Sequence, residues 1–327
     1  MRMITLRGTE ISTSALGFGC AGLTSVNDRR RAVRLLHAAL DAGITHFDVA
    51  RVYGFGHAEA LVGEFMAGRR DSVTVTTKFG LQPPTGLVTG NARIAAIARA
   101  VVRRFPPVAR RIKARAATMV ATGAFTPDAA ARSLEKSLSE LRTDHVDFLL
   151  LHEATLADAR RDDLLAFLAD QVARGTARYV GIGSSSDKIG DDVSRFPAQY
   201  RLFQFENTIC EPRLACMQNS SQVAVITHSA LKPLGALYAA ANHDRSATSE
   251  WSERIGLDLT SRSALARLLL GWAVSENADG VTLFSTTRVE NLHENIAVAA
   301  AAAPRTETLA CFEQFVSTLV SKGILAR

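Results

Sequence analysis

Four polar residues of the 327-residue chain follow apolar or β-branched stretches: Asp48, Tyr53, Lys78 and His152. A tyrosine has a pKa of about 10 and is a poor proton donor near neutral pH. A lysine ammonium beside the phenol would lower that pKa, and an aspartate would keep the lysine charged and fixed in place. A neutral histidine could hydrogen-bond a substrate oxygen. Together the four side chains predict a site that protonates an oxygen on which negative charge develops.

Each of these residues also has an ordinary structural interpretation when it is taken alone. An aspartate at the end of a strand can cap the next turn, and a lysine there can pair with a surface acid. A single histidine is more often a hydrogen-bonded core residue than a catalytic one. The functional interpretation therefore depends on whether the fold brings the four residues together.

Short apolar or β-branched runs alternate with amphipathic stretches along the chain, which is typical of βα units around a parallel sheet. The predicted strands are residues 15–20, 45–49, 72–77, 145–152, 178–183, 201–205, 223–227 and 280–284. The predicted helices are residues 29–42, 58–67, 127–141, 161–174, 188–194, 212–219, 262–275 and 289–302. This order predicts an α/β fold, a single (β/α)8 TIM barrel over residues 1–327.

The barrel gives the four polar residues a common location. Asp48, Lys78 and His152 lie at or just beyond the ends of the second, third and fourth strands, and the loop after the second strand carries Tyr53. The carboxyl ends of barrel strands converge on one mouth, where barrel enzymes keep their active sites. Gly54 would let that loop turn and bring the phenol close to the other groups.

Three segments fall outside the regular alternation. Residues 3–12 alternate around Gly8 and predict a short N-terminal hairpin. Residues 87–124 predict a basic helical insertion after strand 3, and residues 239–260 a long loop after strand 7; both should lie on the active-site face. The basic insertion could bind an anionic substrate or simply cover the barrel. Phe105 is the one aromatic residue among its arginines, so we expect no nucleic-acid binding.

The amino-acid composition further restricts the class of protein. The net charge is +6, hydrophobic residues make up 47% and charged residues 21%, and no long uncharged apolar run is present. The N-terminus lacks the apolar core of a signal peptide. We therefore expect a cytoplasmic protein without membrane contact. The four cysteines are widely spaced and predict free thiols with no metal site. The sequence predicts no particular oligomeric state.

Several motifs resemble those of the aldo-keto reductases, NAD(P)H-dependent carbonyl reductases built on a (β/α)8 barrel. The resemblance is carried by FDVARVYGFGHAE, TTKFG, LEKSLSELRTDHVDFLLLHE, GTARYVGIGSSS and LLLGWAVSENADGVTLFSTTRVENLHENI, which together run nearly end to end. It implies a catalytic tetrad of Asp48, Tyr53, Lys78 and His152, with Tyr53 as the general acid. It also implies a nicotinamide cofactor that lies across the barrel mouth without a glycine-rich Rossmann turn.

The resemblance further implies a set of cofactor-binding residues. They are Gly19, Cys20, Ser184, Gln204, His228, Ser229, Leu231, Lys232, Ser285, Thr286, Arg288, Glu294 and Asn295. Three residues depart from the family pattern: Gly183 and Ser184 fall on a Ser-Asn pair, and His228 falls on a stacking tyrosine. Arg288 falls where the family binds the ribose 2′-phosphate, so NADPH is expected over NADH.

Two functions follow from the sequence. The first is interconversion of a carbonyl (an aldehyde, ketone or sugar lactol) and an alcohol, with a small molecule as substrate and Tyr53 as general acid/base. The second is a cofactor-binding regulatory protein on an aldo-keto reductase scaffold with little turnover, since a fold alone does not fix function. A metal-dependent hydrolase is disfavoured, because only Asp48 and His152 offer ligands at strand ends.

Overall fold

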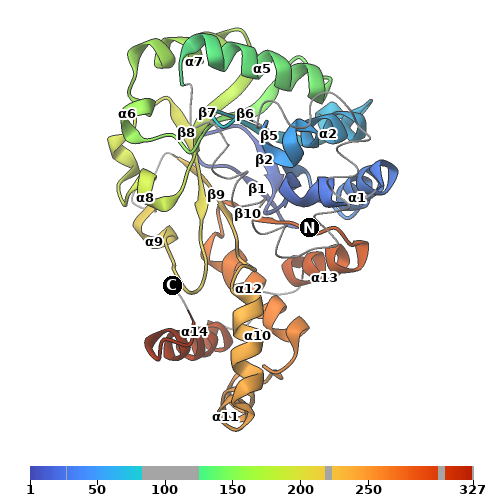
Figure 1. The fold of residues 1–327 in the computed structure, drawn as a ribbon, viewed down its shortest axis with the longest axis vertical. Coiled ribbons are helices and arrows are strands. Elements are labelled where there is room, and N and C mark those ends of the chain that lie inside the picture. Colours follow the sequence, from blue (N-terminus) through green and yellow to red (C-terminus); the bar gives the residue numbers. More distant parts are fainter. Residues whose placement is uncertain (27, 83–124, 218–222, 301–305, 326–327) are drawn as a thin grey trace.

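Eight parallel strands form a closed barrel at the centre of the molecule (Figure 1). The computed structural model describes residues 1–26, 28–82, 125–217, 223–300 and 306–325. The strands are β3 (Leu16–Gly19), β4 (His46–Asp48), β5 (Thr74–Phe79), β6 (Val146–His152), β7 (Ala177–Gly183), β8 (Tyr200–Glu206), β9 (Ala224–His228) and β10 (Val281–Phe284). Each pairs in parallel with the next, and β10 pairs with β3 to close the barrel. The predicted TIM barrel is confirmed.

Helices surround the barrel, and most begin where the sequence predicts. They are α1 (Arg29–Asp41), α2 (Ala58–Met66), α5 (Pro127–Leu141), α6 (Leu156–Ala159), α7 (Asp162–Ala173), α8 (Ser186–Ile189), α9 (Leu214–Met217), α10 (Leu234–His243), α11 (Arg245–Ile255), α12 (Arg262–Glu276), α13 (Val289–Ala300) and α14 (Thr306–Ser321). The start of α5 shows the predicted cap, because the Thr126 side chain accepts a hydrogen bond from the Ala129 N–H and Pro127 occupies the first turn.

Four short 3₁₀ segments complete the described elements. They are η1 (Cys20–Ser25), η2 (Tyr53–Gly56), η3 (Arg70–Ser72) and η4 (Val193–Arg195). The first two follow the carboxyl ends of β3 and β4, at the barrel mouth. The second of them carries Tyr53, so a single tight turn sets the position of the phenol relative to the strand ends.

Three helical parts of the structure differ from the sequence prediction. The helix predicted over 188–194 divides into α8 and η4, because Gly190 adopts a φ of 71° that ends the helix. The loop predicted over 239–260 is instead the end of α10 followed by α11. The sequence did not predict α14. In Figure 1, α10, α11 and α14 lie together below the barrel. Their apolar faces form a second core that includes Leu237, Ile255 and Phe312.

The predicted N-terminal hairpin is present as β1 (Met3–Thr5) paired antiparallel with β2 (Ser12–Ser14). Its turn residues Leu6 and Ile11 are buried with Phe148 and Leu202 from inside the barrel. The Ser14 hydroxyl also accepts a hydrogen bond from the Thr45 N–H just before β4, at 2.9 Å. The hairpin therefore covers the amino-terminal end of the barrel and leaves the strand carboxyl ends as the site of the mouth.

Two further predictions concern the basic insertion and contact with a membrane. The basic insertion predicted over residues 87–124 lies outside the described residues. Within the described part of the chain, no helix combines the length and the hydropathy needed to cross a lipid bilayer.

Candidate active site

Lys78, Asp48 and Tyr53 meet at the carboxyl ends of β4 and β5. The Lys78 ammonium donates to both Asp48 carboxylate oxygens, at 2.6 and 2.8 Å, and to the Tyr53 hydroxyl at 3.1 Å. A weaker contact reaches the Val49 carbonyl at 3.3 Å. Lys78 and Asp48 are each 2% exposed, so almost no water screens the pair. The structure thus brings together three of the four residues that the sequence grouped.

The electrostatics of this cluster differ from the expectation in one respect. Burial disfavours the charge on Lys78, but the Asp48 carboxylate and the phenol outweigh it and raise the lysine pKa. Burial also raises the pKa of Tyr53, and the opposing effect of Lys78 is too small to reverse the shift. The predicted lowering of the tyrosine pKa was therefore wrong in its net direction. The phenol holds its proton at neutral pH, while Lys78 favours the phenolate that proton donation leaves behind.

His152 ends β6 beside this cluster, and its ring lies edge-on to that of Tyr53, with the centroids 6.0 Å apart. Burial, followed by the positive charge of Lys78, lowers its pKa to about 3. The imidazole is therefore neutral over the physiological range, as the sequence analysis expected. Its buried Nδ1 has no hydrogen-bond partner among the described residues. A neutral ring can donate from one nitrogen and accept at the other, which suits contact with a substrate oxygen.

The loop that carries Tyr53 is fixed by a buried ion pair that the sequence analysis did not single out. The Arg51 guanidinium contacts the Glu59 carboxylate, and Glu59 also accepts from the Thr77 hydroxyl at 2.7 Å. Glu59 is fully buried on α2. Gly54 has a φ of +58°, and a side chain there would meet Thr24 at 2.1 Å. Local backbone freedom and a buried charge pair thus place the phenol over Lys78.

A cavity of about 350 Å³ opens beside the Asp48–Tyr53 pair. It brings together nine predicted residues: Gly19, Asp48, Tyr53, Gln204, His228, Ser229, Leu231, Lys232 and Ser285. Ala21, Ala230, Leu283 and Phe284 complete the lining. The carboxyl ends of β3 and β10 are neighbours at this cavity, where the hydroxyl of Ser285, directly after β10, donates to the carbonyl of Gly19 at 2.7 Å.

Gln204 links the cavity to the charged cluster. Its side-chain amide donates to Asp48 Oδ2 at 3.0 Å, so the carboxylate is held by both Lys78 and Gln204. Its Oε1 is buried and has no hydrogen-bond partner in the part of the chain that the structure describes. An unpartnered buried acceptor is costly, and an amide N–H₂ group of a ligand would satisfy it. The sequence resemblance named Gln204 but did not predict its contact with Asp48.

The rim of the cavity carries further polar groups. His228 Nδ1 lies 2.9 Å from the Ser229 hydroxyl, and burial lowers the pKa of this histidine. Ser229 has a φ of 69°, in the left-handed region that non-glycine residues seldom occupy. The Lys232 ammonium is exposed and pairs with Glu206 at the end of β8. These residues lie where the resemblance places cofactor contacts.

The remaining predicted cofactor residues lie outside the lining of this cavity. Cys20 is fully buried and burial raises the pKa of its thiol. The Ser184 hydroxyl donates to the Ala154 carbonyl at 3.0 Å. Thr286 accepts from the Arg288 N–H, and the exposed Arg288 side chain contacts Glu290 at 3.3 Å. On α13, Glu294 is exposed and Asn295 is buried.

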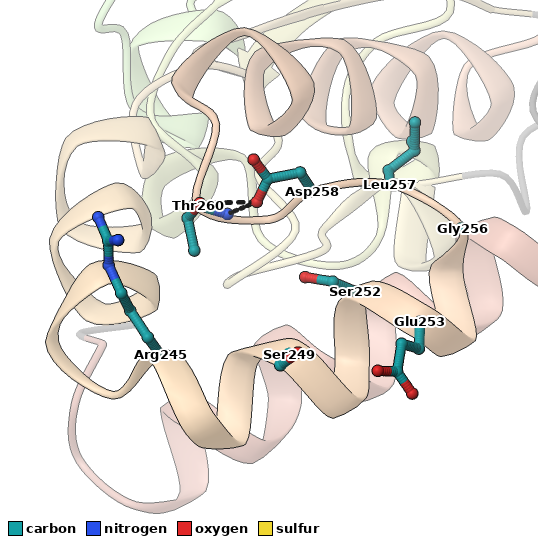
Figure 2. Close-up of a pocket in the computed structure, with 8 residues that line it drawn as sticks. All are labelled: Arg245, Ser249, Ser252, Glu253, Gly256, Leu257, Asp258 and Thr260. Atoms are coloured by element: carbon teal, nitrogen blue, oxygen red, sulfur yellow. Dashed lines mark hydrogen bonds between the residues drawn. The ribbon is translucent and has the colours of Figure 1, made fainter.

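Two larger cavities lie away from these groups. One, of about 480 Å³, is lined by the hairpin and by Arg70, Asp147 and Arg178 near the strand starts. The other, of about 390 Å³, lies along α11 and the loop after it (Figure 2). There the Asp258 carboxylate already accepts from Thr260, and Arg245 already donates to Asn242. No residue of 239–260 is among those that line the Tyr53 cavity. The placement of this segment on the active-site face stays a prediction.

The described residues contain no group of three or more His, Cys, Asp and Glu side chains able to hold a metal ion. At the barrel mouth, the groups able to move a proton are those joined by the Tyr53–Lys78–Asp48 contacts beside the adjacent cavity. Fold and site together define a class of protein: a closed parallel barrel with a lysine-supported tyrosine and a neutral histidine at its mouth.

The chain belongs to the Aldo/keto reductase family, whose sequence model matches residues 15–311. It is 26% identical over 184 residues to the uncharacterized oxidoreductase YqkF of Bacillus subtilis (strain 168), covering 56% of this chain and 49% of that protein. It is 27% identical over 238 residues to the NADP(+) aldo-keto reductase yakc of Schizosaccharomyces pombe, covering 68% and 58%. The alignments thus span about half to three fifths of the length of these relatives.

The fold has solved counterparts as well. The holo form of aldo-keto reductase AKR11C1 from Bacillus halodurans superposes with a TM-score of 0.71 at 20% identity, over 97% of this chain and 96% of that one. At this identity the likeness establishes the fold. The activity of this chain has to be argued from its own site.

Proposed function

We propose that the protein is an NADP(H)-dependent oxidoreductase that interconverts a carbonyl (an aldehyde, ketone or sugar lactol) and an alcohol, with Tyr53 as general acid/base. The observation that carries this proposal is the 3.1 Å contact between the Lys78 ammonium and the Tyr53 hydroxyl, beside a cavity of about 350 Å³. It is an arrangement for moving one proton to or from a small-molecule oxygen. A bound nicotinamide cofactor would supply or accept the hydride.

In the reducing direction, Tyr53 donates its proton to the carbonyl oxygen. The burial that raises the phenol pKa keeps that proton in place until the oxygen becomes basic. Lys78 then stabilises the phenolate, and Asp48 fixes Lys78 through two short hydrogen bonds. His152, neutral and adjacent, hydrogen-bonds the same oxygen and orients it. In the oxidising direction the phenolate accepts the proton, so alcohol oxidation should accelerate as the pH rises.

The residues around the cavity suit a nicotinamide dinucleotide. The unpartnered Gln204 Oε1 can accept from the carboxamide, and the His228 ring lines the same space. Lys232 is exposed at the rim and can turn from Glu206 to the pyrophosphate. Arg288, exposed beyond β10, suits the 2′-phosphate of NADP(H). The name of the Schizosaccharomyces pombe relative, which includes NADP(+), supports this choice.

The test is NADPH oxidation with a panel of aldehydes, ketones and sugars, for the wild type, Tyr53→Phe and the control Tyr238→Phe. Tyr238 is exposed on α10 and is not among the residues that line the cavity. We expect Tyr53→Phe to lower kcat by roughly 10²-fold or more while NADPH still binds, because a general acid contributes about that factor. Full activity of Tyr53→Phe would refute the role of the phenol. Cofactor binding without turnover in the wild type would favour a regulatory protein.

A further inference from the structure

Three hydrogen bonds join the residues after His152 to the end of β7 and to the residues that follow β7. The Glu153 N–H donates to the Gly183 carbonyl at 2.9 Å, and the Ser184 hydroxyl donates to the Ala154 carbonyl at 3.0 Å. From α8, the Lys188 ammonium donates to the Glu153 carbonyl at 2.8 Å. Glu153 and Ala154, which directly follow His152, are thus tied to the neighbouring strand and helix.

Glu153 has a conformation that needs such support. Its φ is 62°, in the left-handed region that is unfavourable for a residue with a side chain. Lys188 contacts this residue twice, at the main-chain carbonyl and at the carboxylate Oε2, 3.0 Å away. Both side chains are only about one third exposed. A strained backbone conformation persists only when surrounding contacts hold it in place. Lys188 supplies two of the contacts that hold Glu153, the residue directly after His152.

Lys188 is also one of the charged groups around His152. Among the described residues, the Tyr53 ring lies edge-on to the imidazole, and Lys78, His228 and Lys188 act on it electrostatically from three other elements. After burial, the charges of Lys78, His228 and Lys188 all disfavour a proton on this ring. The carboxylate of Glu153, which would favour protonation, is paired with Lys188. Loss of Lys188 would remove one cation and leave one anion unpaired.

We propose that Lys188 is a positioning residue: by holding the left-handed backbone of Glu153 and pairing with its carboxylate, it fixes the orientation of His152 and the charges beside its ring. The role of His152 on the substrate oxygen rests on the proposed function. The link from Lys188 to His152 rests on the contacts alone and can be measured without turnover.

The kinetic test compares Lys188→Met, Lys188→Arg and the matched control Lys136→Met. Lys136 also pairs with a glutamate, at 2.7 Å, but on the outer surface of α5. We expect Lys188→Met to lower kcat by roughly tenfold with a smaller change in KM, since misplacement of a group at the reacting oxygen costs 10- to 100-fold. Lys188→Arg should recover most of that loss. A kcat for Lys188→Met equal to that of Lys136→Met would overturn the proposal.

The second readout is the pKa of His152, followed by NMR of ¹⁵N-histidine-labelled protein and assigned by the signal that disappears in His152→Gln. In the wild type the imidazole should stay neutral down to about pH 3. In Lys188→Met its pKa should rise, and in Lys136→Met it should not. An unchanged His152 pKa in Lys188→Met would overturn the proposal even if kcat fell. Because the titration needs no substrate, a wild type without turnover would refute the proposed function and leave this test intact.

Glu153→Gly provides a test that survives poor folding of Lys188→Met. Glycine adopts a φ of 62° without strain, so the backbone no longer needs the lysine. Lys188→Met should lower kcat and the melting temperature in both backgrounds. We expect both losses to be several-fold smaller in the Glu153→Gly background than in the wild-type background. Equal losses in the two backgrounds would show that Lys188 acts independently of Glu153, contrary to the proposal.

Discussion

His46, buried inside the barrel on β4, should make the protein sensitive to acid. The side chain is 0% exposed, with Nε2 at 3.1 Å from the Thr76 hydroxyl, and Nδ1 accepts from and donates to none of the described residues. Burial lowers its pKa to about 4, although Asp48 and Asp147 act in the opposite direction. A protonated imidazolium has no carboxylate in direct contact there, so the folded barrel binds this proton weakly.

The sign and size of the effect follow from linkage. In the unfolded chain the histidine has its ordinary pKa of about 6.5, so below that pH the unfolded state takes up a proton that the folded state refuses. The associated stability is complete above about pH 6.5 and is lost as the pH falls towards about 4. At about 1.4 kcal/mol per pH unit over this window, the unfolding free energy drops by on the order of 3 kcal/mol.

The assay is urea unfolding of the wild type, His46→Gln and the control His57→Gln between about pH 7 and pH 4. Glutamine does not titrate, so the decrease in unfolding free energy towards acid should be smaller in His46→Gln by on the order of 3 kcal/mol. His57 is exposed, and its substitution should leave the wild-type pH dependence in place. His152 remains in all three proteins and cancels in the comparison. An identical pH dependence in His46→Gln and wild type would refute the reasoning.

Three further outcomes are expected. Gly54→Ala should lower the unfolding free energy in urea by about 2 kcal/mol, because φ is +58° and the new methyl meets Thr24; Gly68→Ala, also at positive φ but in open space, should cost less. Glu59→Gln should cost about 3 kcal/mol in the same assay, because it leaves a buried guanidinium without its charge partner. Arg288→Gln should raise the Kd of NADPH roughly tenfold in a fluorescence titration and leave that of NADH unchanged; equal effects would contradict a 2′-phosphate contact.

The barrel could be predicted from the sequence because its strands are short, apolar and separated by recognisable helices. The runs around Phe47, Val75 and Leu149 are buried on β4, β5 and β6 as expected. The same alternation placed Asp48 and Lys78 at strand ends, and parallel register then brought them into contact. Prediction of the cluster therefore required only the order of the strands and the position of each polar residue within its strand.

Features that depend on packing were not predictable in this way. The periodic apolar residues Leu309, Phe312 and Val316 were a signal for α14, but their partners on α11 and α12 are specified only by the tertiary fold. The direction of the Tyr53 pKa shift depends on how much burial outweighs one lysine, which residue types alone do not determine. The support of Glu153 by Lys188 likewise requires a backbone conformation that the sequence does not reveal.

The closure of the barrel has a consequence for synthesis. The first barrel strand, β3, takes one of its two neighbours from β10, where Leu16 pairs with Thr282 near the other end of the chain. While the ribosome is still adding the later helices, β3 has an open hydrogen-bonding edge that can pair with another nascent chain. The native circle of strands can form only after nearly the whole polypeptide has emerged. Chaperone depletion or rapid translation should therefore lower the soluble yield. The unfolding free energy of protein that has already folded should change much less.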